Sequence, residues 1–213
     1  MKVIKREALL ELESTHQPLS KHLQLIIDVS KEHSQISLEY LLQQLGKRGY
    51  TSLIFFISLA FSFPISIPGL STPFGLVLAF LGLWIALGKE LGLPSWLKSK
   101  SLSFQSFERI GKKAIWLFSL LERFMRPRIL SLSENKLFIS LNGLIVLVLA
   151  ILLALPIPIP LTNILAAFPI VLISLGQLEK DGVLIIMGYA GAIFSITLFG
   201  ILFTTLSTLL SFI

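Results

Sequence analysis

Residues 49–88 read GYTSLIFFISLAFSFPISIPGLSTPFGLVLAFLGLWIALG, a run of 40 residues without Lys, Arg, Asp or Glu. Three prolines, Pro64, Pro68 and Pro73, lie near its middle. About 20 apolar residues suffice for a helix to cross the hydrocarbon core of a bilayer, so this run predicts two membrane helices that reverse at the prolines. Because proline interrupts helical hydrogen bonding, the run equally fits two half-helices that meet inside the membrane as a re-entrant hairpin.

Two further runs carry no formal charge, residues 137–178 with 42 residues and residues 182–213 with 32. The three runs hold more than half of the 213 residues, and the mean hydropathy of the chain is +0.84. This composition excludes a disordered chain and an ordinary water-soluble domain. It predicts an all-α integral membrane protein with five membrane segments. The absence of cysteine excludes a disulfide framework, cysteine-ligated zinc and a cysteine nucleophile.

The positive charge gathers between the runs. Residues 89–136 carry a net charge of +6, whereas residues 1–50 carry +1 and residues 137–213 carry −1. Short loops rich in Lys and Arg stay in the cytoplasm, so we expect the N-terminus and residues 89–136 on that side. The expected partners of these charges are anionic lipid headgroups; no nucleic-acid motif accompanies them, so no nucleic-acid partner is expected.

The polar parts of the chain have the pattern of amphipathic helices. Leu19, Leu23, Ile26 and Ile27 share one helical face, and Ser37 is a plausible N-cap for a helix over residues 38–45. A second apolar stripe, too short to span a membrane, comprises Phe107, Ile110, Ala114, Leu117, Leu121 and Phe124. The chain then divides into N-terminal cytoplasmic helices (1–48), a first membrane repeat (49–88), a basic interfacial segment (89–136) and a second repeat with a final helix (137–213).

Two of the uncharged runs share a motif. Residues 63–68 (FPISIP) align with residues 155–160 (LPIPIP) at an offset of 92, and each motif is followed by small polar residues. Proline-interrupted segments at matching places in two halves are typical of a transporter's binding site, because half-helix starts leave backbone N–H groups for a polar or anionic solute. The substrate-binding candidates are Ser66, Pro68, Gly69, Ser71, Thr72, Pro160, Thr162 and Asn163.

Other interpretations of these segments remain open. Both motifs fit tight turns between ordinary helices, or a lipid or water cavity, and Ser71 or Asn163 could cap a helix. The orientation of the repeats is also open. Wholly cytoplasmic residues 89–136 favour parallel repeats, whereas inverted repeats require an odd number of crossings between them.

Residues 63–75 (FPISIPGLSTPFG) resemble the Pro-rich signature of the ExoD exopolysaccharide-synthesis family. The resemblance covers roughly residues 35–205 and implies an inner-membrane protein of bacteria associated with exopolysaccharide production, without a known reaction. The sequence departs from the family pattern at Lys89, where Arg is expected, and in the order of residues 94–97 (PSWL). The resemblance extends over Leu87-Gly88, Trp96-Leu97, Leu121-Glu122-Arg123, Arg126-Pro127-Arg128, residues 156–163, Leu175-Gly176 and Asp181-Gly182.

Charged residues supply the remaining candidates. Arg123, Arg126 and Arg128 are candidates for contact with an anion or a lipid headgroup, and the alternative is an edge that anchors in lipid. Asp181 is a candidate coupling carboxylate, and the alternative is a solvated turn before Gly182. No catalytic triad, phosphate-binding loop or metal-ligand spacing is visible, so no enzyme activity, cofactor or metal is expected.

The sequence favours a small-solute transporter or channel-like protein that binds a small polar or anionic solute where the two broken repeats meet. A homodimer is expected, because five membrane segments enclose little space. The alternative is a non-transporting accessory protein of exopolysaccharide or envelope assembly that docks its partners through residues 89–136. A membrane enzyme ranks third.

Overall fold

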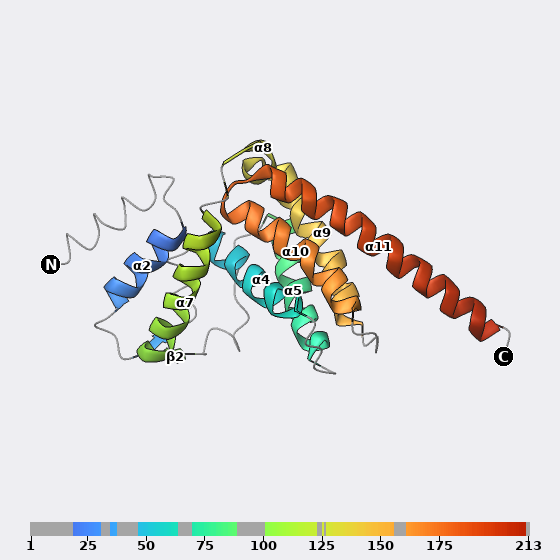
Figure 1. The fold of residues 1–213 in the computed structure, drawn as a ribbon, viewed down its shortest axis with the longest axis horizontal. Helices are drawn as coiled ribbons and strands as arrows, with labels where there is room; N and C mark the ends of the chain where they lie inside the picture. Colours follow the sequence, from blue (N-terminus) through green and yellow to red (C-terminus); the bar gives the residue numbers. More distant parts are fainter. Residues whose placement is uncertain are drawn as a thin grey trace. The chain divides into compact units, whose positions relative to one another are not determined.

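The computed structural model describes residues 19–30, 35–37, 47–63, 70–88, 101–122, 125, 127–155 and 161–211 (Figure 1). The chain divides into two units. Unit 1 comprises Met1–Gly49 and Gly92–Arg126, so it joins the N-terminal segment to the basic central segment. Unit 2 comprises Tyr50–Leu91 and Pro127–Ile213 and holds nearly all of the three uncharged runs.

Unit 1 pairs two amphipathic helices, α2 (Leu19–Ser30) and α7 (Phe104–Glu122). The side chain of Ile27 lies against α7 at Gly111, where an added Cβ would come within 2.6 Å of Ile27 Cδ1. Both predicted amphipathic helices are therefore confirmed. Within α7, Glu108 and Lys112 form an ion pair whose charged atoms lie 2.8 Å apart. The residues buried in unit 1 include Leu23, Ile26, Ile27, Ala114 and Phe118.

A small sheet accompanies these helices and corrects the expectation of a purely helical chain. Strand β1 (Gln35–Ser37) pairs with β2 (Ser101–Ser103) in antiparallel register, with Ile36 opposite Leu102. Backbone groups just beyond α2 and just before α7 thereby satisfy one another across the two segments. Ser37 lies in β1, so it is not the N-cap predicted for it, and residues 38–46 fall outside the described part of the chain.

Unit 2 is helical in its described residues. Two pairs of consecutive helices, α4 (Lys47–Phe61) with α5 (Ser71–Ala86) and α9 (Lys136–Ala154) with α10 (Thr162–Leu178), flank the two proline motifs in the sequence. The short helix α8 (Ser131–Glu134) precedes α9, and α11 (Gly182–Ser211) follows α10. The first three residues of α4 fall in unit 1.

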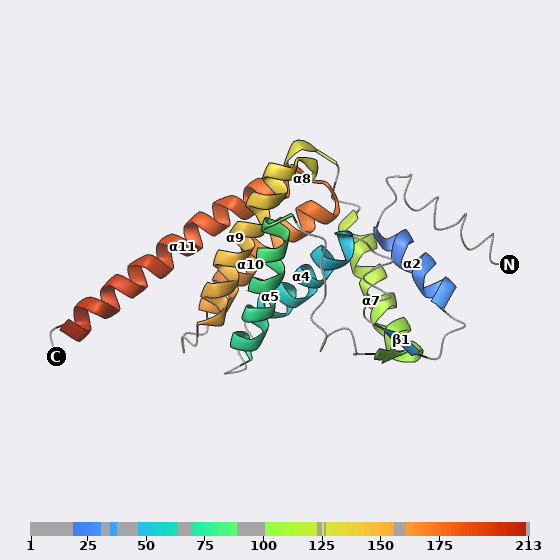
Figure 2. The same ribbon diagram turned by 180° about the vertical axis from the view of Figure 1, so that it is seen from behind.

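Glycines set the closest helix contacts of unit 2. Helix α5 lies antiparallel to α9, since a Cβ added at Gly75 would lie 2.8 Å from Ala154 Cα and one added at Gly82 would lie 2.7 Å from Leu147 N. Helix α11 lies antiparallel to α10, where Gly188 meets Ile173 and Gly191 meets Pro169 (Figures 1 and 2). Close backbone approach at small residues is characteristic of helix packing in membranes. The core that they enclose contains Ile54, Leu78, Leu149, Leu153, Ile170 and Ile173.

Two helices are long and apolar enough to cross a bilayer, Lys136–Ala154 and Gly182–Thr205. Large apolar side chains also cover their outer faces; Ile193 and Phe203 are each 68% exposed. A core helix of a soluble protein would bury such a surface, whereas a helix that is apolar all round is typical of a membrane span. These features are compatible with a membrane protein.

The other three apolar helices are shorter than the sequence suggested. Helices α4, α5 and α10 contain 15, 16 and 17 residues, or roughly 22–26 Å at 1.5 Å per residue, against about 30 Å of hydrocarbon. The expected halves of about 20 residues are reduced because the helices stop short of the proline motifs, where helical hydrogen bonding is interrupted.

Candidate functional site

The first candidate site lies where α5 and α10 begin. The N-caps are Leu70 and Leu161, both in right-handed helical conformation and both without a side-chain capping hydrogen bond. The first helical residues, Ser71 and Thr162, carry hydroxyl groups and are each only 7% exposed. The two helices therefore start alike, with a buried hydroxyl and backbone N–H groups that no cap side chain satisfies. The alternative role of Ser71 as the cap of α5 is not observed, because Leu70 holds that position.

The helix ends that flank the two proline motifs lie at the same end of unit 2. The contact of Gly75 with Ala154 places the start of α5 beside the end of α9. The rings of Phe61, at the end of α4, and Phe74, near the start of α5, have centroids 5.7 Å apart. Figure 2 shows these helix ends together (α4, α5, α9 and α10). Helices α5 and α10 thus begin at the same end of unit 2, and the parallel orientation of the repeats stays a prediction.

Half of the predicted substrate-binding residues lie in the described part of the chain. Thr72 and Asn163 are half-buried beside Ser71 and Thr162, in the first turns of α5 and α10. The structure therefore places four of the predicted residues at the two helix starts. The other four, Ser66, Pro68, Gly69 and Pro160, lie outside the described residues.

Buried serines deeper in unit 2 are satisfied within the helices. The hydroxyl of Ser58 donates to Ile54 O at 2.7 Å, and that of Ser174 donates to Ile170 O at 2.7 Å. The hydroxyl of Ser195 donates to Leu165 O at 2.5 Å and so ties α11 to α10. A buried hydroxyl with a backbone partner is already satisfied. These three serines therefore offer no free polar group to a solute that would pass between the helices.

A second candidate site joins Arg128 to the turn before α11. Arg128 N–H donates to Lys180 O at 3.2 Å, and Gly182 N–H donates to Arg128 O at 2.7 Å. Asp181 is only 5% exposed, and its Oδ1 accepts a hydrogen bond from Val183 N–H at 3.0 Å. Asp181 thus satisfies a backbone donor in the first turn of α11. The predicted alternative of a solvated turn is wrong for this carboxylate.

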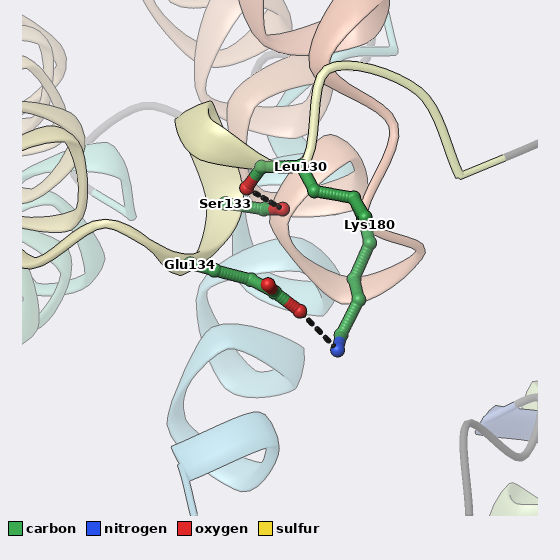
Figure 3. Close-up of polar contacts among 4 residues, drawn as sticks. All are labelled: Leu130, Ser133, Glu134 and Lys180. Carbon is green, nitrogen blue, oxygen red and sulfur yellow. Dashed lines mark hydrogen bonds and ion pairs between the residues drawn. The ribbon is translucent and has the colours of Figure 1, made fainter.

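Side chains around this junction form an ion pair at its edge. Lys180 Nζ lies 2.6 Å from Glu134 Oε1, and Ser133 Oγ donates to Leu130 O at 3.0 Å (Figure 3). Lys180 has a φ of +56° and Ile129 a φ of +50°, in a region that a β-branched residue rarely adopts. The side chain of Arg128 is exposed, while Arg123 and Arg126 lie outside the described residues. The junction brings together two motifs that are about 50 residues apart in the sequence.

A buried amide at this end of unit 2 was missed by the sequence reasoning. Asn142 is fully buried in α9; its Nδ2 donates to Leu132 O at 3.2 Å, and its Oδ1 accepts from Tyr189 Oη at 2.6 Å. The amide thereby connects α8, α9 and α11. One carboxamide within an apolar run is expensive in hydrocarbon unless it is bonded, and this is the signal that could have found it.

The chain is similar to proteins of one known family. The family model described as "Exopolysaccharide synthesis, ExoD" matches residues 19–201. The chain is 31% identical over 155 residues to Protein ExoD of Rhizobium meliloti, covering 72% of this chain and 65% of that relative. It is also 31% identical over 185 residues to an uncharacterised protein of Synechocystis sp., covering 86% of this chain and 84% of the relative. No solved structure matches the chain at a significant level.

Proposed function

The chain belongs to the ExoD family, and from this premise we propose that it is an accessory protein of exopolysaccharide production in the bacterial inner membrane. The family description associates these proteins with exopolysaccharide synthesis, and the relative in Rhizobium meliloti carries the family's name. The apolar outer faces of α9 and α11 support the membrane location. In this proposal residues 89–136 face the cytoplasm, because they hold the excess of Lys and Arg.

The observation that carries an accessory role is the packing inside unit 2. Glycines bring the backbones of α5 and α9 into contact. The hydroxyls of the buried Ser58, Ser174 and Ser195 donate hydrogen bonds to helix carbonyls. A solute path between helices requires groups that replace water of hydration, and these contacts supply none. The sequence favoured transport over an accessory role; we rank the accessory role first, and this packing supports that order.

Transport remains the second candidate, favoured by the paired starts of α5 and α10. Two uncapped helix N-termini carry partial positive charge, and each adds a buried hydroxyl, Ser71 or Thr162. Together they suit a small polar or anionic solute. In this candidate a homodimer encloses the path, because the glycines of one chain hold α5 against α9 and α11 against α10.

The two candidates separate in a paired experiment. Exopolysaccharide is measured in cells that lack the gene and in the same cells complemented with wild-type protein, and solute flux is measured with the pure protein in liposomes. We expect the deletion to lower exopolysaccharide, complementation to restore it, and the liposomes to show no flux above that of empty vesicles. Unchanged exopolysaccharide in the deletion strain would contradict the accessory role, and flux above that of empty vesicles would support transport.

Hydroxyl variants sharpen the comparison. Ser71→Ala with Thr162→Ala removes both buried hydroxyls, and Thr197→Ala is the matched control, because that exposed hydroxyl donates only to Ile193 O of its own helix. In an accessory protein all of these variants restore exopolysaccharide. Protein-dependent flux that the double variant reduces and the control preserves would overturn the accessory role in favour of transport.

A further inference from the structure

Helix α7 exposes a face directly opposite its contact with α2. Gly111, Ala114 and Phe118 are buried on the inner side. On the other side Trp116 is 67% exposed and Leu120 is 41% exposed. Arg109, Lys112 and Lys113 are exposed on the same side, since residues spaced three or four apart share one face of a helix. We call Arg109, Lys112, Lys113, Trp116 and Leu120 the basic aromatic face.

The charge on this face is positive. The acid beside it is Glu108, which pairs with Lys112 at 2.8 Å. Within the described residues no acidic side chain pairs with Arg109 or Lys113. Asp28 is an exposed acid on the neighbouring helix α2, where it accepts a hydrogen bond from Gln24 of the same helix. The face therefore presents uncompensated cations next to a large exposed indole.

The order of residues along α7 is also asymmetric. The three cations lie in its first half, and Trp116 and Leu120 lie in its second half, toward Glu122. Only residues 123–135 separate the end of α7 from the start of α9. If α9 spans a bilayer, the apolar end of α7 is thus tethered near the membrane surface.

We infer that the basic aromatic face docks unit 1 onto the anionic headgroups of the membrane in which unit 2 is embedded. Cations near an anionic leaflet gain electrostatic attraction, and an indole is favourable at the level of the headgroups. Leu120 adds apolar area that the acyl boundary can bury. A bilayer surface accounts for the cations, the exposed indole and the short connection between α7 and α9. The inference rests on the membrane location proposed above.

Tryptophan fluorescence tests this docking in the whole chain. The sequence contains three tryptophans, Trp84, Trp96 and Trp116. Trp84→Phe with Trp96→Phe leaves Trp116 as the reporter for α7. Trp84 tolerates Phe because its indole N–H has no hydrogen-bond partner in the described part of the chain and its ring stacks on Phe80. A second reporter, Phe194→Trp in a background where all three tryptophans are Phe, replaces an exposed aromatic residue of α11 and reports on membrane insertion of unit 2.

Both proteins are reconstituted into vesicles with bromine either near the headgroup or deep in the acyl chain. We expect shallow bromine to quench Trp116, with stronger quenching in vesicles that contain anionic phosphatidylglycerol than in phosphatidylcholine alone. Deep bromine should quench the reporter at position 194. Added salt should weaken the quenching of Trp116 and leave the deep reporter unchanged, since salt screens exposed charges.

Matched lysine variants isolate the charge of the face. Lys113→Gln removes a cation from the basic aromatic face and should lower the ratio of docked to free α7 about fivefold, whereas Lys21→Gln removes an exposed cation from α2 and should leave the ratio unchanged. A quenched deep reporter with an unquenched Trp116 would overturn docking while membrane insertion stands. If neither reporter is quenched, both the docking and the proposed membrane location are contradicted. If the quenching of Trp116 changes neither with anionic lipid nor with Lys113→Gln, the electrostatic basis of the docking is overturned.

Discussion

Gly182 begins α11 at the point where Arg128 crosses the preceding turn. An added Cβ would lie 2.8 Å from both Ile129 Cβ and Ile129 O, and 2.9 Å from Arg128 O. The sequence identified Asp181 by its charge and the pair Asp181-Gly182 through a family resemblance, because an Asp-Gly pair alone predicts little more than a turn. The backbone of residues 128–129 supplies the physical reason for the glycine.

The first prediction concerns this glycine. Gly182→Ala should lower the free energy of unfolding by about 1–3 kcal/mol, as expected for overpacking against backbone. Gly200→Ala is the matched control in the same helix, where nothing lies within 4 Å of an added Cβ; alanine there should stabilise by up to about 1 kcal/mol. Thermal unfolding of both variants in one detergent measures the difference, and equal midpoints would contradict the crowding at Gly182.

Helices α5 and α9 show what element-level patterns reveal and what they miss. Their apolar composition and the prolines between the runs predicted helical hairpins, and helices lie where those hairpins were expected. Gly82 lies in the first uncharged run and in α5. Its role in closing the interface with α9 depends on which helix lies opposite, and the pattern of one helix cannot supply that information.

The glycine interface predicts non-additive stability. Gly82 and Gly143 face each other, since a Cβ at Gly82 would lie 3.0 Å from Gly143 O and one at Gly143 would lie 2.7 Å from Gly82 O. Gly82→Ala and Gly143→Ala should each destabilise by about 1–3 kcal/mol. The double variant should cost less than their sum, because the first methyl group already separates the helices.

Unfolding free energies of the single and double variants in detergent complete this cycle. Leu144→Ala is a control at the neighbouring exposed position of α9, and it should change stability less than either glycine variant in the micelle. Strict additivity of the two glycine variants would show that the close contact between α5 and α9 does not exist in the membrane-protein preparation.

At the scale of the whole unit, the orientation of the hairpins was left open by the charge pattern. The contact of Gly75 with Ala154 places the start of α5 and the end of α9, the helix ends next to the two motifs, at one end of unit 2. The junction of Arg128 with Gly182 lies at the starts of α9 and α11. A membrane crossed by unit 2 would therefore have the motifs on one side and the junction on the other.

The absence of native cysteine allows this topology to be tested directly. Single variants Phe63→Cys and Leu161→Cys place a thiol at exposed positions beside the two motifs, and Lys136→Cys places one at the opposite end. A membrane-impermeant thiol reagent should label positions 63 and 161 from the periplasm, and position 136 only after the cells are opened. Labelling of 63 and 161 from opposite sides would contradict the parallel orientation.

Composition and spacing determined the local features of this protein. Uncharged runs, prolines and apolar stripes predicted the helical hairpins, the final helix and the amphipathic α2 and α7, since each signal resides within one short segment. Only the tertiary structure decided which segments meet: α5 with α9, β1 with β2, Arg128 with Gly182, and Asn142 with Tyr189. These pairings depend on how closely distant backbones approach, and no local pattern of residues records that distance.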